Sequence, residues 1–488
     1  MTAEPRILDA AGWRRLGWAL QQGDLELVSL WGEPELVHVA VRRSAGPPMT
    51  VHSLPCPDGA YPALSLDHPP AARLERALAD LVGLKAIGAR DARPWLDHGR
   101  WGDAHPVSGP RPAGEPPAAY RFLPVEGEGL HQVPVGPVHA GVIEPGHFRF
   151  TANGETVVRL EARLGYTHKG TTALMAGAPL DHAARLAGRV SGDSTVAYAF
   201  AFALAAEAAL GVAAPARAQW LRGLMAELER LANHLGDIGA ICNDAAFAIM
   251  HAHCGVLRER VLRAAAAAFG HRLMMDLIIP GGVAADIHPG GTVAIADAVS
   301  RIGEVFPHLV DVYDETNSLQ DRTVGTGIVS SDLVRAFGAG GFVGRASGRD
   351  FDARRWGRYA PYDALTFEVP VFAEGDVNAR VWVRIREVQQ SLAMIDQMLT
   401  KLPAGPIRLD LPHAAGGDGE GAVLVEGFRG DIFAWLRLDG EGRVGACHLR
   451  DPSWFQWPLL EAAIEGDIIA DFPLCNKSFN CSYSGPDL

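Results

Sequence analysis

One stretch is apolar on nearly every helical face: residues 195–211, TVAYAFAFALAAEAALG, in which Glu207 is the single charge. Such a run predicts a helix buried deep in a large core. A polar, glycine-broken turn precedes it, RVSGDS at 189–194. The hydroxyls of Ser191 and Ser194 are three residues apart, a spacing that puts them on one face of a helical turn. The spacing suits two metal ligands, but the side chains are alcohols and not thiols.

Apolar positions at i, i+3 and i+4 predict a series of helices around this run. We expect them over residues 181–188, 195–210, 214–239, 242–269, 292–304 (extending toward 314) and 377–402. Short loops between long helices indicate antiparallel neighbours, so a helical bundle is predicted. The dipeptide Asn153-Gly154 between alternating segments predicts a hairpin of residues 147–152 and 156–164. Two further strand-like segments, 421–440 and 443–451, follow near the end.

The chain divides into three parts by composition. Residues 1–101 combine a short helix (7–21), strand-like alternation (25–41) and an amphipathic helix (70–84), which indicates a small α+β domain. Residues 102–135 are rich in proline and glycine and predict an extended linker, because proline fixes φ and removes a donor. Residues 136–488 form the second domain. The fold class predicted is α+β, with a mainly α-helical bundle, a peripheral β-hairpin and C-terminal strands.

Composition narrows the classes of function. The net charge of −13 argues against nucleic-acid binding, which needs a basic surface. No uninterrupted apolar run reaches membrane-spanning length, and residues 1–18 lack the apolar region of a signal peptide, so we expect a cytoplasmic chain without a direct membrane span. The six cysteines show no CxxC spacing, which predicts buried or free thiols and no thiolate metal site.

Local motifs for metal or phosphate binding are weak. His251, His253 and Cys254 (HAHC) suggest zinc, but residues i and i+2 of a helix diverge, so surface or core histidines are the favoured interpretation. The glycines of GFVGRASGRD at 341–350 do not follow the dinucleotide-binding spacing, and a close-packed loop is predicted there.

Charged residues also occur inside the apolar pattern. Glu227, Arg230 and His234 share one helix face, where they form either a buried network that fixes helix register or a network that carries protons. The alternation of Arg159, Glu161 and Arg163 places these side chains on one face of a strand. That face is either solvated or a polar lining against the bundle.

Eight segments occur in the order found in one superfamily. They are GPVHAGVIEPGHFRF, RLGYTHKG, GRVSGDSTVAYA, AELERLANHLGDIG, PGGV, RASGRDFD, GDVNARVWVRIRE and DPSWFQWPLLEAAIEGDIIADFPL. From residue 136 onward the chain resembles the large subunit of nickel–iron hydrogenases of the formate-hydrogenlyase and hydrogenase-4 type, and the homologous quinone-site subunit of respiratory complex I. Residues 1–101 are similar to the small α+β subunit that complex I places beside it.

The resemblance implies a metal site whose ligands have been replaced. The family's first motif, Arg-Ile-Cys-Gly-x-Cys-x-x-x-His, stands here as residues 189–194 with Ser191 and Ser194 at the cysteines and Tyr198 at the histidine. The second, Asp-Pro-Cys-x-x-Cys, is matched by residues 479–484, where Cys481 remains and Ser484 replaces its partner. A thiolate is a soft ligand that forms near neutrality, whereas a serine hydroxyl is a hard donor of far higher pKa. We therefore expect no metal and no nickel–iron centre on this chain.

The residues that contact the quinone head in complex I are also replaced, with Pro145 and Gly192 at the matching positions. The resemblance therefore does not imply a quinone site of the complex I kind, and no cofactor bound by this chain is expected. Quinone is kept as a possible ligand, and the iron–sulfur clusters are expected in partner subunits. Around the vacated pocket the resemblance places a polar set: Glu144, Arg149, Arg189, Ser191, Asp193, Ser194, Glu227 and Arg230, with His168 nearby.

Two hypotheses follow. In the first, the chain is a large-subunit-like component of a membrane-associated complex, without the metal, that acts in assembly, electron-transfer docking or proton coupling. Its partners would be an iron–sulfur small subunit and proton-pump-like membrane-arm subunits at the inner face of the cytoplasmic membrane. In the second, it reduces a quinone-like acceptor with an unfamiliar catalytic set drawn from His147, His168, Tyr198 and Asp193.

Overall fold

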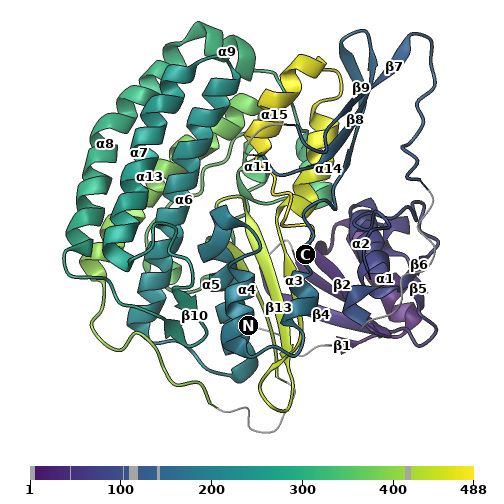
Figure 1. Cartoon of the computed structure of the whole chain (residues 1–488), viewed down its shortest axis with the longest axis horizontal. Coiled ribbons are helices and arrows are strands. Elements are labelled where there is room, and N and C mark those ends of the chain that lie inside the picture. The colour runs from purple at the N-terminus through teal and green to yellow at the C-terminus, as the bar shows by residue number, and fades with distance from the viewer. Residues whose placement is uncertain (1–5, 44–45, 103, 109–118, 140–142, 413–418) are drawn as a thin grey trace.

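The computed structural model of the chain describes residues 6–43, 46–102, 104–108, 119–139, 143–412 and 419–488. Four long helices lie side by side in it: α6 (Ala216–Asp244), α7 (Ala248–Phe269), α8 (Gly291–Glu315) and α13 (Val377–Lys401) (Figure 1). They form a helical bundle, and α6 and α7 are two of the helices from which the sequence predicts a bundle. The prediction that the first of them ends at Gly239 is wrong, because α6 runs on to Asp244. A Cβ at Gly239 would lie 2.9 Å from the Cβ of Cys254, so this glycine lets α7 pack closely against α6 without ending the helix.

The apolar run at 195–211 forms α5 (Thr195–Leu210), and nearly all of its residues are buried, as predicted. It packs on a three-stranded antiparallel sheet of β12 (Glu420–Glu426), β13 (Asp431–Leu438) and β14 (Val444–Arg450). A Cβ at Gly421 would collide with the carbonyl oxygen of Ala205, so small residues on both elements allow this close approach. The segment Gly192–Leu210 is long and apolar enough to cross a membrane by composition, but 72% of its apolar window is buried inside the fold.

The predicted hairpin is present as β8 (His147–Asn153) and β9 (Thr156–Arg163). A third strand, β7 (Leu130–Val135), pairs with β8 and lies inside the stretch predicted as an extended linker, which corrects that prediction. Pro134 is tolerated because β7 is the edge strand of the β7-β8-β9 sheet, where a missing N–H breaks no ladder. Residues 103 and 109–118 of the predicted linker lie outside the described residues.

The N-terminal part contains α1 (Ala10–Gln22), α2 (Ala72–Val82) and a four-stranded sheet of order β1-β4-β3-β2. Its strands are β1 (Arg6–Ile7), β2 (Glu26–Glu33), β3 (Leu36–Arg43) and β4 (Gly46–Pro55). The first helix begins at residue 10 and not at 7, because the Asp9 carboxylate accepts a hydrogen bond from the N–H of Gly12 (2.6 Å) and caps it. Trp13 shares one apolar cluster with Phe148 and Trp457, so this part packs directly on the rest. The domain boundaries stay a prediction.

The remaining helices and strands are short and connect these layers. They are β5 (Ala60–Pro62), β6 (Lys85–Ile87), α3 (Thr171–Met175), α4 (Leu180–Ala187), β10 (Ile278–Ile279), β11 (Gly282–Val283), α9 (Asn317–Thr323), α10 (Ser331–Phe337), α11 (Gly341–Ala346), α12 (Ala353–Gly357), α14 (Ser453–Ala463) and α15 (Phe472–Phe479). The stretch predicted as a glycine-rich loop from residue 341 therefore contains α11 and α12. The predicted α+β class with a mainly helical second part is confirmed.

Candidate functional site

The turn before α5 holds an ion pair where the resemblance implies a metal. Asp193 lies in a single turn of 3-10 helix, η4 (Gly192–Ser194), and accepts two hydrogen bonds from the Arg429 guanidinium, at 2.8 and 2.5 Å. Ser191 Oγ donates to the same carboxylate at 2.6 Å, and Arg429 Nη1 lies 3.2 Å from Ser194 Oγ. We call Ser191, Asp193, Ser194 and Arg429 the corner. Its central cation is a guanidinium.

Electrostatics keep this pair ionised. Burial by itself raises the pKa of the Asp193 carboxyl, but the Arg429 guanidinium outweighs burial and holds that pKa below its ordinary value. The Asp193 side chain is still 36% exposed, whereas that of Arg429 is 5% exposed. Loss of the ion pair is therefore expected to cost more for Arg429, which has little access to water, than for Asp193, which water can reach.

The C-terminal segment meets the corner at the same arginine. Arg429 Nε donates to the carbonyl oxygen of Asn480 at 2.5 Å. The residue that follows Asn480 in the chain is Cys481, which is buried. Burial raises the pKa of the Cys481 thiol, so it stays protonated near neutrality. Ser484 is buried as well, and its N–H donates to Glu144 at 3.1 Å. The turn and the tail thus converge, as the two metal motifs of the family imply.

Tyr198 lies one helical turn into α5 and is fully buried. Its hydroxyl donates to Asp451 Oδ2 at 2.5 Å, while Asp451 Oδ1 accepts the N–H of Ser453 at 2.8 Å. Burial and the Asp451 carboxylate raise the pKa of the Tyr198 hydroxyl well above its ordinary value. At neutral pH this tyrosine is a fixed hydrogen-bond donor.

Other candidates lie away from the corner. Arg189 points outward and makes a salt bridge with Asp276, and its side chain is 42% exposed. His168 Nδ1 lies 3.1 Å from the buried Asp487 carboxylate, and its ring stacks on Trp101 at 4.4 Å. Between these two, Lys169 Nζ donates to the carbonyl oxygens of residues 189 and 190, at 3.0 and 2.9 Å. Burial lowers the pKa of that ammonium group.

His147 and Arg149 both lie on β8. The His147 ring faces the carbonyl oxygen of Gly136, and Arg149 Nη1 donates to Gln132 at 3.1 Å. The Arg149 guanidinium also covers the ring of Phe122 at 4.4 Å. His147, His168 and Tyr198 therefore have separate surroundings, and within the described part of the chain each is hydrogen-bonded to a different partner.

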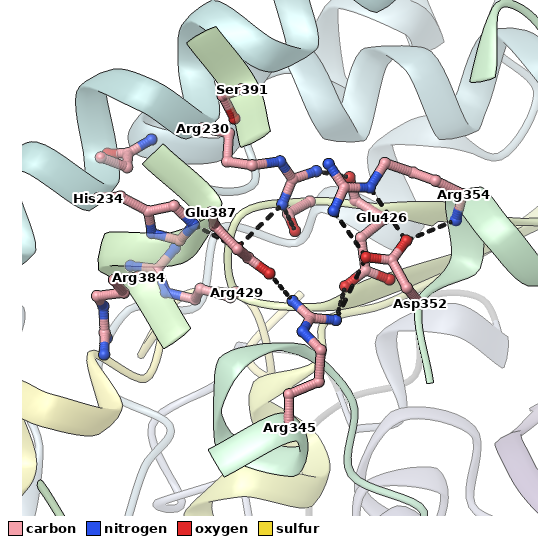
Figure 2. Close-up of polar contacts among 12 residues, drawn as sticks. Arg230, His234, Arg345, Asp352, Arg354, Arg384, Glu387, Ser391, Glu426 and Arg429 are labelled. Carbon is pink, nitrogen blue, oxygen red and sulfur yellow. Dashed lines mark hydrogen bonds and ion pairs between the residues drawn. The ribbon is translucent and has the colours of Figure 1, made fainter. Parts of the chain in front are cut away.

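Glu227 and Arg230 belong to a buried ion-pair network between α6, α13 and the segment 345–362. Figure 2 shows Arg230 with Glu387, Arg345 and other members of this network. Glu227 accepts hydrogen bonds from Arg354, Tyr362 and Ser391 at 3.0, 2.8 and 2.7 Å. Arg230 lies 3.3 Å from Glu227 and donates to the carbonyl oxygens of residues 426 and 427. The predicted shared face of Glu227, Arg230 and His234 is thus confirmed and fully buried.

Glu387 of α13 is the centre of this network. One carboxylate oxygen accepts from His234 Nε2 at 2.5 Å, and the other pairs with Arg345. Arg345 also pairs with Glu426 at 2.9 Å, and all of these side chains are at most 1% exposed. Burial favours the neutral form, but the Arg345 cation outweighs it and holds the pKa of Glu387 well below its ordinary value. The carboxylate therefore stays charged inside the protein.

The sequence patterns missed most partners in these groups. Arg384, Glu387 and Ser391 follow Arg380 at intervals of four, three and four, a polar stripe on a helix that could have been found from its 3.6-residue period. Arg429 gave no such signal, because it lies in the connection between β12 and β13. On the polar face of β9, Glu161 and Arg163 are buried and Arg159 is partly exposed. Glu161 pairs with Arg93 at 2.7 Å and accepts from Tyr120 at 2.8 Å, so it faces these two residues.

A buried carboxyl caps α5 beside the corner. Glu229 of α6 accepts the N–H groups of Val196 and Ala197 at 2.7 and 3.0 Å. Burial raises its pKa from the ordinary 4.5 to about 8. The folded protein thus binds a proton here that the unfolded chain has released, so stability is lost as pH rises from about 4.5 to about 8.

We expect Glu229→Gln to remove this pH dependence, because an amide fills the same space and does not ionise. The unfolding temperature of the variant should improve relative to the unchanged protein as pH rises from about 5 to about 8. Thermal unfolding at several pH values measures it, with Glu259→Gln, an exposed position, as the matched control. A constant difference between variant and unchanged protein across this range would show that Glu229 does not carry the effect.

The donor set at the corner does not fit a nickel–iron centre. The corner offers the hydroxyls of Ser191 and Ser194 and an Asp193 carboxylate already paired with a cation, and the C-terminal segment adds the Ser484 hydroxyl and a protonated Cys481 thiol. Soft metals need thiolates, and their sites are judged by ligand identity and number. Among the residues that the structure describes, no group of three or more histidine, cysteine or acidic side chains could hold a metal ion. In the HAHC motif, His251 and His253 are exposed and Cys254 is buried, so both histidines lie on the helix surface.

Known proteins share this architecture. A family model described as "Respiratory-chain NADH dehydrogenase, 49 Kd subunit" matches residues 244–416. Formate hydrogenlyase subunit 5 of Escherichia coli (strain K12) is 30% identical over 443 residues, covering 88% of this chain and 77% of that protein. A D-type subunit of the NADH-quinone oxidoreductase of Koribacter versatilis (strain Ellin345) is 29% identical over 367 residues, covering 69% of this chain and 90% of that protein. A chain from the structure of the membrane-bound sulfane sulfur reductase, an archaeal respiratory membrane complex, superposes with a TM-score of 0.70 and 27% identity, covering 75% of this chain and 100% of that one.

This chain therefore belongs to the superfamily that includes formate hydrogenlyase subunit 5 and the D-type subunit of NADH-quinone oxidoreductase. Its relatives are subunits of oxidoreductase complexes, and the structurally similar chain belongs to a membrane-bound one. The resemblance stated from the sequence is confirmed.

Proposed function

We propose that this chain is the large-subunit-like component of a membrane-associated oxidoreductase complex and that it carries no nickel–iron centre. The observation that supports this most is the Asp193–Arg429 ion pair at the convergence of the two segments that match the family's metal motifs. The guanidinium supplies a fixed positive charge among hydroxyl groups, and it satisfies the carboxylate without any metal.

In this proposal the chain docks two kinds of partner. An iron–sulfur small subunit would pack near the corner, and membrane-arm subunits resembling proton pumps would hold the complex at the inner face of the cytoplasmic membrane. The support is the similarity to subunits of multisubunit complexes, one of which is an archaeal respiratory membrane complex. The chain itself would bind no metal, and the clusters would belong to the partner.

Proton coupling is the proposed task of the buried network. Glu387, His234 and Glu227 are titratable groups joined by hydrogen bonds and arginines inside the bundle, and such groups can change protonation when a nearby charge changes. Burial lowers the pKa of His234 and the neighbouring Glu387 carboxylate opposes that effect. An electron arriving on a partner would alter this balance through the local field.

A second candidate function is reduction of an acceptor at the old pocket. The name of the similar complex, a sulfane sulfur reductase, favours testing a sulfur acceptor as well as a quinone. The separate surroundings of His147, His168 and Tyr198 do not support the set considered from the sequence. The His168 ring, hydrogen-bonded to the buried Asp487 carboxylate, is the member of that set that we propose to test.

The test uses the intact complex, purified with its partners through a tag on this chain. We expect no hydrogen oxidation or evolution with artificial electron carriers. Hydrogen turnover that is lost on nickel depletion would contradict the proposal. Reduction of a quinone or of polysulfide that disappears in His168→Ala, but not in the exposed control His308→Ala, would favour the second candidate, provided that both variants assemble.

A further inference from the structure

A cleft separates the N-terminal sheet from the segment that contains α10 and α11. It has a volume of about 720 Å³, within the range of about 300–1,000 Å³ typical of small-molecule sites. The N-terminal part supplies the end of α1, the start of β2 and the turn at 67–70, and the second part supplies α10 and residues 348–351. The cleft is remote in sequence from the corner, and the inference drawn from it does not depend on the proposed function.

Two buried arginines line this cleft and pair with the same carboxylate, while Asp431, paired with Arg450, is a further negative charge near Arg42. Arg42 and Arg349 are 4% and 7% exposed, and both pair with the same oxygen, Oε2, of Glu26. Their guanidiniums also lie against one ring, that of Phe351, at 3.8 and 4.7 Å. Burial and the neighbouring Arg349 cation lower the pKa of Arg42 to about 10. Two cations held so close favour an additional anion.

Two of the other charged lining residues are paired with groups outside the cleft. Asp350 pairs with Arg355, and Arg335 lies 3.5 Å from Asp332, so each has a partner outside the cleft lining. The third, Asp67, is half-buried and belongs to the N-terminal part, as Arg42 does.

An unpartnered histidine nitrogen also belongs to the cleft wall. His68 is 8% exposed, and its buried Nε2 has no hydrogen-bond partner among the described residues. Burial lowers the pKa of this imidazole to about 4, so the ring is neutral at pH 7 and can donate one hydrogen bond. This nitrogen is therefore available to a group that is not part of the protein chain.

We infer that this cleft binds a small organic anion that carries a carboxylate or phosphate group. The planar guanidiniums of Arg42 and Arg349 suit such oxygens, the His68 ring adds one neutral donor or acceptor, and Leu25, Leu27 and Phe337 offer an apolar surface for the rest of the molecule. Because both walls contribute, the bound anion would fasten the N-terminal part to the second part and stabilise the whole chain.

The test measures binding of two probes, inorganic pyrophosphate and citrate, to the full chain by isothermal titration and thermal unfolding. Sodium chloride at equal ionic strength is the control. We expect saturable one-to-one binding of at least one probe and a rise in unfolding temperature, and the better probe tells phosphate from carboxylate recognition. Absence of saturable binding by both probes would overturn the inference.

Three variants locate the site. Arg349→Gln should weaken binding about tenfold or more, as expected for loss of a charged hydrogen-bond donor. Ala336→Trp, at an exposed position of the cleft wall, should block binding without disturbing the core, which keeps the test valid if Arg349→Gln fails to fold. Arg443→Gln, an exposed arginine elsewhere, should bind normally. Binding that is unchanged in Ala336→Trp would place the anion elsewhere and refute the inference.

Discussion

Glu387→Gln is expected to destabilise the protein by about 3–5 kcal/mol, the usual cost of removing one partner from a buried ion pair. The carboxylate is 1% exposed and faces Arg345 directly and Arg230 at 3.9 Å. Glutamine keeps the shape of the side chain and can still accept a hydrogen bond from His234, but it leaves two buried guanidiniums with less negative charge than they need. Thermal and urea unfolding followed by circular dichroism measure the loss.

The matched control is Glu368→Gln, because Glu368 is exposed. Its backbone N–H donates to Gln390, and the substitution does not change that hydrogen bond. It should shift stability by less than about 0.5 kcal/mol. An equal, small effect of both substitutions would mean that the network does not rely on Glu387.

Asp193→Asn should cost about 3 kcal/mol, because the nearly buried Arg429 guanidinium loses its paired carboxylate and keeps only the more distant charges of Asp237 and Asp451. Ser191→Ala removes one hydrogen bond to the same carboxylate and should cost only about 1 kcal/mol. The double variant Asp193→Asn, Arg429→Met should recover part of the stability, since no unpaired charge remains.

The stability of the double variant, compared with that of the two single variants, shows whether Asp193 and Arg429 interact with each other. If Asp193 and Arg429 contribute independently, the losses of the single variants will add in the double variant. Additive losses would contradict the description of the corner as a closed ion pair. Unfolding of the single variants Asp193→Asn and Arg429→Met and of the double variant under one set of conditions provides the measurement.

Much of the fold followed from periodicity, because long elements carry strong patterns. The helix at 195–210 and the hairpin around Asn153-Gly154 were predicted almost to the residue. Errors arose where tertiary packing overrides local signals: Gly239 sits inside α6 because α7 approaches it, and β7 includes Pro134 because it is an edge strand. Both exceptions depend on neighbours that are distant in sequence.

The candidate site was predictable only in part. Serine at the expected cysteine positions could be read directly, and the shared face of Glu227 and Arg230 followed from helical spacing. Arg429 could not be found in this way, because it reaches Asp193 across 236 residues from a short loop between strands. Arg189 fits the family motif in sequence yet points outward to Asp276, since a position next to a turn does not fix the side-chain direction.

We propose that the Asp193–Arg429 ion pair stands at the corner in place of a metal. The most direct test of this claim is the nickel content of the intact complex, produced with nickel supplied in excess and measured by mass spectrometry against the amount of this chain. Formate hydrogenlyase purified in parallel serves as the comparison. We expect nickel far below one atom per chain, and no gain after Asp193→Asn. One nickel atom per chain, lost when Cys481 is changed to alanine, would contradict the account.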